Sequence, residues 1–324
     1  MTSVEEHGTV EPATAAPDAP GSDPNGKRRE ADRDGLWRVL AFPGIAWTLV
    51  FFAVPFYAIV CVAFGATDPL FGEPVPSWNP LRWQFTTFHE VLVRSMGGDL
   101  TAVFVRTLVY VGAALALCTL VGYPVAYYVA RLAGRRRGLL LGLILAPWWI
   151  NYLTRMMAWL ALLQDEGYVN RALEAIGVIG APVQWLSGNP YTVIVALAYG
   201  YLPFYIVPLF ATLDQIDPRL IEASRDLGMG TARTFWRVTL PLSRAGLLTA
   251  SVITALPMLG DYYTNTLVSG SPETTMIGNQ IDLYLLGGPQ KHLGAALVLV
   301  LSLLLMVLMA YYLRTSRRET QEAS

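Results

Sequence analysis

The chain has 324 residues, of which 54% are hydrophobic and only 15% charged, and its formal net charge is −1. Soluble domains usually contain about 25% charged residues, so this composition indicates a membrane protein and gives no reason to expect a nucleic-acid partner. Two cysteines, Cys61 and Cys118, fall in apolar segments, and the three histidines lie far apart in the sequence. Neither a disulfide framework nor a metal site is predicted.

The amino-terminal segment differs from the rest of the chain. Residues 1–38 are rich in Ala, Pro, Gly, Asp and Glu without an apolar period, which predicts a disordered cytoplasmic tail. A cleavable signal peptide is not expected, because the first apolar run begins near Val39 and is long enough to span a bilayer. Residues 39–315 are predicted to form an all-α membrane domain, and residues 316–324 a second cytoplasmic tail.

Six segments reach the length of about 20 apolar residues that a membrane-spanning helix needs. Several of them contain proline, which is tolerated where neighbouring helices or a cavity satisfy the freed backbone groups. The predicted spans are 40–64, 103–130, 139–163, 190–213, 246–268 and 292–313.

The distribution of Lys and Arg predicts the orientation of these spans. Most basic residues fall in one alternating set of connections, namely 27–38, 131–137, 219–244 and 314–318. By the positive-inside rule, both termini and the loop 214–245 are predicted to be cytoplasmic.

This cytoplasmic loop contains a short predicted helix. Asp217 followed by Pro218 is typical of an N-cap with proline in the first helical position, and Gly228 is a suitable C′ residue. A capped helix on a loop between spans is a natural contact for a partner protein.

An energy-coupling site is not found in the chain itself. Neither of its lysines, Lys27 and Lys291, belongs to a G-x-x-x-x-G-K-[ST] phosphate-binding loop. No serine nucleophile elbow or kinase-type set is present either. Any use of ATP would therefore require another subunit.

The loop also carries a recognisable motif, made of Glu222, Ala223, Ser224, Gly228, Val238, Leu240 and Pro241. It resembles the E-A-A, three residues, G, nine residues, I-x-L-P pattern of permease subunits of ABC importers, with Ser in place of the second Ala and Val in place of Ile. In that family this segment is the coupling helix, which docks into a groove of the ATPase subunit. The resemblance therefore assigns coupling to Glu222, Ala223, Ser224, Gly228, Leu240 and Pro241.

Other stretches are similar to spermidine/putrescine permease subunits. They include Pro147-Trp148-Trp149 with Arg155 and Trp159, Gly122-Tyr123-Pro124, and Gly260-Asp261 with Met276-Ile277-Gly278, within residues 40–315. The resemblance implies a type I ABC importer permease with six transmembrane helices, in the cytoplasmic (inner) membrane, that imports polyamines.

The resemblance further implies the partners of the chain. These are two ATPase subunits, which bind ATP and Mg²⁺, a second permease subunit, an extracytoplasmic solute-binding protein, and membrane lipid. The chain itself would bind no cofactor and would not be an enzyme. Whether the second permease is a different protein or another copy stays open.

Independent physical reasoning points to a cationic substrate. Asp261 lies in a predicted span beside Tyr262 and Tyr263, and an ionisable residue inside a membrane is by default a functional candidate. Ammonium groups are stabilised by carboxylates and by aromatic faces. The candidate substrate pathway therefore consists of Asp261, Tyr262, Tyr263, Trp159 and, at the outer end of the third span, Asp165 and Glu166.

Three alternatives remain open. Asp261 could instead form a structural or gating ion pair with Arg155, the other charge predicted inside a span. The substrate could be another small solute, such as iron(III) or a sulfate-like anion, in which case Arg155 would contact the ligand. A secondary transporter is also conceivable, although no paired broken helices or internal repeat are visible.

Overall fold

The computed structural model describes residues 41–68, 74–288 and 290–322, with side chains described through residue 316. The described residues belong to two units, with the boundary between Tyr57 and Ala58. The predicted tail 1–38 lies outside the described residues. Helix α15 continues to Glu322, beyond the predicted domain boundary at residue 315.

The described residues are mostly helical, as predicted. One small antiparallel hairpin pairs β1 with β2, with Ala66 opposite Val75 and Thr67 opposite Pro74. The elements in chain order are η1 (Leu49–Ala53), α2 (Val54–Ala63), β1 (Ala66–Thr67), β2 (Pro74–Val75), η2 (Pro80–Arg82), α3 (Thr86–Gly97), α4 (Asp99–Arg131), η3 (Gly134–Arg136), α5 (Arg137–Leu145), η4 (Ala146–Trp149), α6 (Tyr152–Leu163), α7 (Tyr168–Ala175), α8 (Pro190–Gln215), α9 (Pro218–Asp226), α10 (Thr231–Thr234), η5 (Phe235–Thr239), α11 (Leu240–Leu242), α12 (Arg244–Leu259), α13 (Tyr263–Val268), η6 (Pro272–Thr274), α14 (Ile277–Leu286) and α15 (Lys291–Glu322).

By length and composition, the described part of the chain has four candidate membrane spans, or six if each of two bent helix pairs forms one span. Four are continuous helices, at Ala41–Ala63, Asp99–Arg131, Pro190–Gln215 and Lys291–Ser316. The other two are bent pairs, in which Gly134–Trp149 meets Tyr152–Leu163 at 88° and Thr231–Leu242 meets Arg244–Leu259 at 61°. The prediction of a six-span helical protein is confirmed, but the predicted third span, 139–163, is not a single straight helix.

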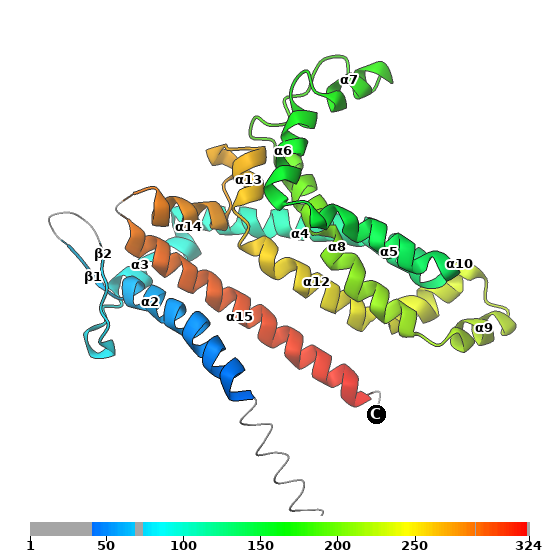
Figure 1. Ribbon diagram of the computed structural model, residues 1–324, viewed down its shortest axis with the longest axis horizontal. Helices are drawn as coiled ribbons and strands as arrows, with labels where there is room; N and C mark the ends of the chain where they lie inside the picture. The colour runs from blue at the N-terminus through cyan, green and yellow to red at the C-terminus, as the bar shows by residue number, and fades with distance from the viewer. Residues whose placement is uncertain (1–40, 69–73, 289, 323–324) are drawn as a thin grey trace, which may run out of the picture. The chain divides into compact units, whose positions relative to one another are not determined.

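The break in the third span has a local cause. Ile150 is extended, and the side chain of Asn151 accepts a hydrogen bond from the Leu153 backbone N–H, which caps the start of α6. Asparagine is among the preferred N-cap residues, so it begins a new helix here rather than continuing the old one. Figure 1 shows α6 turning away from α5 at this point.

The predicted fifth span, 246–268, is also interrupted. Helix α12 ends at Leu259 with Gly260 as its C-cap, and the short helix α13 starts only at Tyr263. The Oδ1 atom of Asp261 accepts the backbone N–H of Thr264 at 2.8 Å, so a carboxylate satisfies one of the donors that the break releases. Polar backbone at membrane depth requires such internal partners.

Helices α4, α8 and α12 form the centre of the second unit, with α8 in contact with both others (Figure 1). Their contacts use small residues, which allow helix backbones to approach closely in a membrane protein. A Cβ atom on Gly246 of α12 would collide with the side chain of Thr212 on α8. The buried hydroxyl of Tyr205 on α8 bonds the Thr119 hydroxyl of α4 at 2.7 Å.

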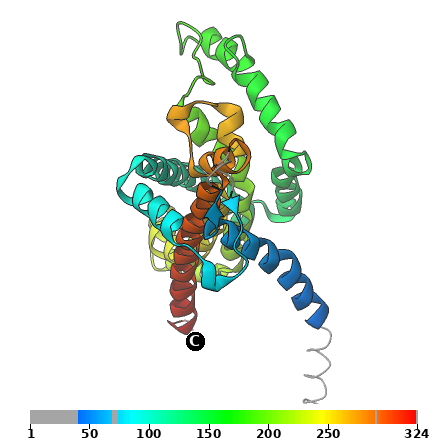
Figure 2. The same ribbon diagram turned by 90° about the vertical axis from the view of Figure 1, so that its left-hand side faces the viewer.

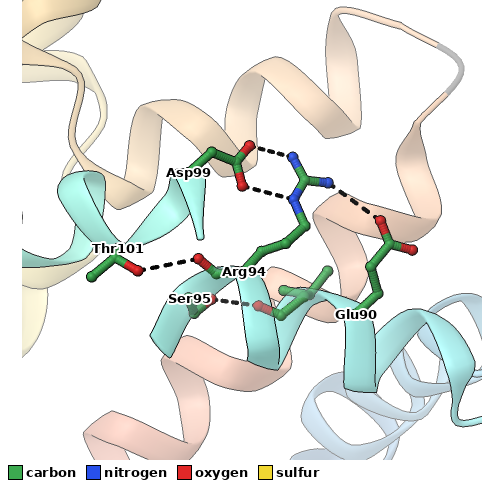
Figure 3. A network of polar contacts seen from close by, with 6 residues as sticks. Glu90, Arg94, Ser95, Asp99 and Thr101 are labelled. Carbon is green, nitrogen blue, oxygen red and sulfur yellow. Dashed lines mark hydrogen bonds and ion pairs between the residues drawn. The ribbon is translucent and has the colours of Figure 1, made fainter. Parts of the chain in front are cut away.

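The end of α15 that begins at Lys291 packs against α3 and α14 (Figures 1 and 2). At the same end, an ion-pair network fixes the turn between α3 and α4 (Figure 3). Arg94 donates to both carboxylate oxygens of Asp99, at 2.8 and 2.5 Å, and lies 3.5 Å from Glu90. Both acids are more than half exposed, so the network orients the turn and contributes only modestly to stability.

The contact at Gly246 leads to a stability prediction. We expect Gly246→Ala to destabilise the protein by about 1–3 kcal/mol, because the new methyl group overpacks the α8–α12 contact. The readout is the apparent melting temperature of the purified protein in detergent.

Gly142→Ala is the matched control, since it is also a helical glycine and a Cβ there would meet nothing within 4 Å. Thr212→Ala in the Gly246→Ala background should restore part of the loss. Equal melting temperatures for the two single variants would contradict the proposed packing.

Candidate functional site

The break between α5 and α6 and the break between α12 and α13 face α8 across a cavity of about 660 Å³. Its walls come from the segment around the α5–α6 break, from the middle of α8 and from the α12–α13 break. Half of the lining residues are aromatic, and the charged groups among them are Arg155 and Asp261. The lining consists of Trp148, Trp149, Ile150, Asn151, Tyr152, Arg155, Gly200, Tyr201, Phe204, Pro257, Gly260, Asp261, Tyr262 and Tyr263.

The carboxylate of Asp261 is nearly buried and is held by neutral donors. Its Oδ2 atom accepts the hydroxyls of Tyr201 at 2.9 Å and Thr264 at 2.7 Å, and the Tyr152 hydroxyl lies at 3.4 Å. The hydroxyls of Tyr152 and Thr264 also bond each other. Hydrogen bonds to an ionised carboxylate stabilise it, but neutral donors leave its negative charge uncompensated. The site can therefore attract a cation.

Arg155 lies on another wall of the same cavity. Its guanidinium carbon is 5.5 Å from the centre of the Tyr152 ring and 5.9 Å from that of Trp148. These are cation–π distances. The side chain is nine-tenths buried, and its Nε atom has no hydrogen-bond partner.

The predicted ion pair between Arg155 and Asp261 is not formed in this structure. Among the described residues, the ion pairs within 4 Å involve Arg94 and Arg137 and do not include Arg155. The reason is that hydroxyl groups occupy the carboxylate of Asp261, while aromatic faces hold the guanidinium of Arg155.

The structure brings some of the candidate pathway residues together and separates others. Tyr262 and Tyr263 line the cavity beside Asp261, with their ring centres 4.1 Å apart. Trp159 packs against Tyr199 instead and does not line the cavity. Asp165 and Glu166 are exposed in the connection between α6 and α7, away from the cavity lining.

Sequence reasoning missed the residues that surround Asp261. Tyr152 and Tyr201 are separated from it by 109 and 60 positions. An aromatic residue in a span is usually a packing residue, so nothing local distinguishes these two. The one feature of the sequence that could have indicated Tyr152 and Tyr201 is their hydroxyl group, which needs a hydrogen-bond partner when it lies inside a membrane span.

A helix outside the cavity supports the break at Asp261. A Cβ atom on Gly278 of α14 would lie 2.7 Å from the carbonyl oxygens of Gly260 and Asp261. The amide of Asn279 donates to the Tyr262 carbonyl at 2.7 Å. The missing side chain at position 278 therefore lets α14 hold the interrupted backbone directly.

The predicted short helix in the polar loop is present as α9. The Asp217 side chain accepts the backbone N–H of Arg219 at 2.9 Å, which caps the start. At the other end, Gly228 donates to Arg225 and Met229 donates to Ser224, and Gly228 has a φ of 80°. This paired pattern is a Schellman motif, which favours glycine at the left-handed position.

The motif residues of this segment have distinct environments. Glu222 and Ala223 are exposed on α9. Ser224 is buried, and its hydroxyl lies 3.0 Å from that of Thr234 on α10. Leu240 and Pro241 are the first two residues of α11, directly after the π-helical turn η5. A proline cannot donate the usual backbone hydrogen bond, which explains the widened turn before it.

The polar loop is attached to α4 at several points. The ring of Phe235 meets Tyr123 and Tyr127 edge-on, at 5.6 and 5.8 Å between ring centres. The Tyr123 hydroxyl bonds that of Ser243 at 2.7 Å, at the start of α12. Arg131, the last residue of α4, donates to the Ile216 carbonyl at 2.6 Å. These contacts fix both ends of the loop to the central helices.

Apolar side chains are exposed on this polar segment. Leu227 is 83% exposed, Trp236 65% and Leu220 49%. Exposed apolar groups clustered on an otherwise charged surface are typical of a protein interaction site. The segment α9–α11 therefore has the features of a docking element.

Taken together, a six-span helical fold, a cavity at two helix breaks and a docking segment joined to the spans define a membrane transport subunit. Residues 122–319 match the family described as the binding-protein-dependent transport system inner membrane component. The chain belongs to this family of ABC importer permease subunits.

Relatives agree with this assignment. The spermidine/putrescine transport system permease protein PotB of Escherichia coli (strain K12) is 31% identical over 275 residues, which cover 84% of this chain and 95% of that protein. PotB of Haemophilus influenzae is 30% identical over 274 residues, covering 84% and 91%.

The fold agrees as well. A chain in the crystal structure of a bacterial alginate ABC transporter, in complex with an alginate pentasaccharide-bound periplasmic protein, superposes with a TM-score of 0.68 at 20% identity. The match covers 90% of this chain and 97% of that one.

The carboxylate network gives a testable prediction. We expect Tyr201→Phe to lower stability by about 1.5–3 kcal/mol, because it removes a hydrogen bond to a buried charged group. The measurement is thermal unfolding of the purified protein in detergent.

Tyr199→Phe serves as the control, since it lies on the same helix and its contact with Trp159 is made by the ring. If both substitutions had the same small effect, the Tyr201 hydroxyl would not be bonded to a buried charge.

Proposed function

We propose that this permease subunit carries polyamines such as spermidine or putrescine across the cytoplasmic membrane. The observation that carries the proposal is the Asp261 carboxylate, which lines an aromatic cavity and receives neutral donors only. The names of the PotB relatives support the same substrate class.

The chemistry of the cavity suits an ammonium group. A carboxylate offers charge, and the faces of Tyr262, Tyr263 and Trp148 offer cation–π contacts, each of about 0.5–2 kcal/mol depending on desolvation. A flexible chain of methylene groups between ammonium groups would pack against the remaining aromatic side chains. A substrate with both features is a polyamine.

The proposal includes the partners of the chain. Two ATPase subunits would bind ATP and Mg²⁺ and engage α9, a second permease would complete the pathway, and an extracytoplasmic solute-binding protein would deliver substrate. Both termini and the loop 214–245 would be cytoplasmic, in keeping with the distribution of Lys and Arg. The exposed Leu220 and Leu227 provide apolar contacts for the ATPase.

The contacts of the loop with α4 and α12 suggest how a conformational change of the ATPase subunits would reach the helices that line the cavity. Closure of the ATPase subunits would displace α9, and the contacts of Phe235 and Arg131 would carry this displacement to α4. Because a single residue, Ser243, joins α11 to α12 at a bend of 61°, and α12 ends two residues before Asp261, the same displacement would reach the cavity.

One observation favours a second candidate. Arg155 is a buried cation without a partner at Nε, and a sulfate-like anion would satisfy it. This candidate is weaker because the same cavity holds the Asp261 carboxylate, which would repel an anion.

Transport measurements test the substrate. We expect a complex of this chain with its ATPase and permease partners, reconstituted in vesicles, to take up radiolabelled spermidine in an ATP-dependent manner. Asp261→Asn should weaken spermidine binding about tenfold or more, because the cation loses a charged partner in a cavity of low polarity. Uptake of labelled sulfate but not of spermidine would support the anion alternative instead.

The coupling segment gives a separate prediction. Gly228→Pro should abolish the coupling of ATP hydrolysis to uptake, because proline requires a φ near −65° where Gly228 has 80°. It also removes the N–H that donates to Arg225 at 2.8 Å. The measurement is the number of substrate molecules taken up for each ATP hydrolysed.

Gly230→Ala is the control, because Gly230 has an ordinary φ of −67° and a Cβ there meets nothing within 4 Å. Unimpaired uptake by Gly228→Pro would mean that the turn after α9 has no part in coupling.

A further inference from the structure

Arg155 is the charged group of the cavity that the proposed function does not use. Its side chain is 9% exposed, its Nε lacks an acceptor, and no carboxylate among the described residues pairs with it within 4 Å. A buried cation in this state is costly unless something else stabilises it. The presence of this arginine in the cavity therefore requires an explanation beyond packing.

The stabilising groups are aromatic. The guanidinium lies over the rings of Tyr152 and Trp148, at 5.5 and 5.9 Å from their centres. Those two rings line the same cavity as Asp261. An ammonium group of a substrate would seek the same faces. The arginine thus already occupies cation-binding surface within the cavity.

Tyr152 connects the two charges. Its ring faces the guanidinium of Arg155, while its hydroxyl lies 3.4 Å from the carboxylate of Asp261. A cation bound at Asp261 therefore meets the fixed positive charge of Arg155 across a single side chain. With one acid and one base among the lining residues, the formal charge of the cavity is close to zero.

We propose that Arg155 is a specificity-determining residue, a tethered cation that competes with the substrate's ammonium groups and keeps a polycation from binding tightly in the cavity. This inference rests on the proposed polyamine function. Repulsion between like charges grows with the number of ammonium groups, so the effect is larger for a tetraamine than for a diamine. Weak binding in transit favours release, which a transport pathway needs.

Direct binding measures this effect without interference from a solute-binding protein. The purified complex of this chain with its permease and ATPase partners, in detergent, is equilibrated with radiolabelled putrescine, spermidine or spermine. Wild type is compared with Arg155→Gln and Arg155→Met, which remove the charge, and with Arg155→Lys, which retains it. The melting temperature of each variant is recorded alongside.

We expect Arg155→Gln and Arg155→Met to lower the Kd for spermine by about tenfold, and that for putrescine by less, because one unit of like charge is removed from a poorly screened site. Arg155→Lys should stay near the wild-type value. The neutral variants should also release spermidine more slowly. A damaged fold would weaken binding, so tighter binding separates this role from a structural one.

The inference is overturned if wild type binds polyamines and the neutral variants bind them with the same or higher Kd. A loss of binding in both neutral variants that Arg155→Lys restores would likewise overturn it, because the positive charge would then be needed for binding. Failure of the proposed function has a different signature, namely a wild-type complex that neither binds nor takes up any polyamine.

Discussion

The hydrogen bonds of Asp261 connect the parts of this protein that determine its cavity. One carboxylate receives a hydroxyl from α8, the hydroxyl and backbone N–H of Thr264 at the start of α13, and lies near a hydroxyl from α6. A membrane offers no water to interrupted backbone, so breaks in a span persist only where the protein supplies partners. The same charge that stabilises the break at Gly260 is therefore available to a ligand. The same side chain therefore stabilises the fold and, in the proposed function, would recognise the substrate.

The second constraint is mechanical. If α9 docks to a partner as proposed, it can act on the distant cavity only through a tight connection to the spans, and three contacts provide this connection. Phe235 is held between two tyrosines of α4, Tyr123 bonds Ser243, and Arg131 bonds the carbonyl of Ile216. Close packing of α4, α8 and α12 through small residues makes these helices a stiff unit.

In the proposed function the cavity combines attraction and repulsion. Asp261 would attract a cation, while Arg155 lies over the aromatic faces of Tyr152 and Trp148. A transport site must bind its substrate weakly enough to let it go. Two opposite charges separated by one aromatic side chain would satisfy that requirement without any change in the fold.

Local sequence determined much of this protein. The length of the apolar segments predicted six spans, because bilayer thickness sets the length of a helix. The cap at Asp217 and the turn at Gly228 predicted α9, since both depend on neighbouring residues alone. The coupling motif indicated the family by itself, because its residues are close together in the chain.

Only the tertiary structure decided the arrangement of the site. Apolar length does not reveal a break, so the interruptions at Ile150–Asn151 and at Gly260 were missed. The alternative pair of Arg155 with Asp261 is not formed: Asp261 is bonded by Tyr152 and Tyr201, which lie 109 and 60 positions away from it in the sequence. Asp165 and Glu166 were predicted to lie on the pathway, but they are exposed between α6 and α7 and do not line the cavity. Sequence determines the charge and local geometry of each residue, but which residues share a cavity depends on how distant helices pack.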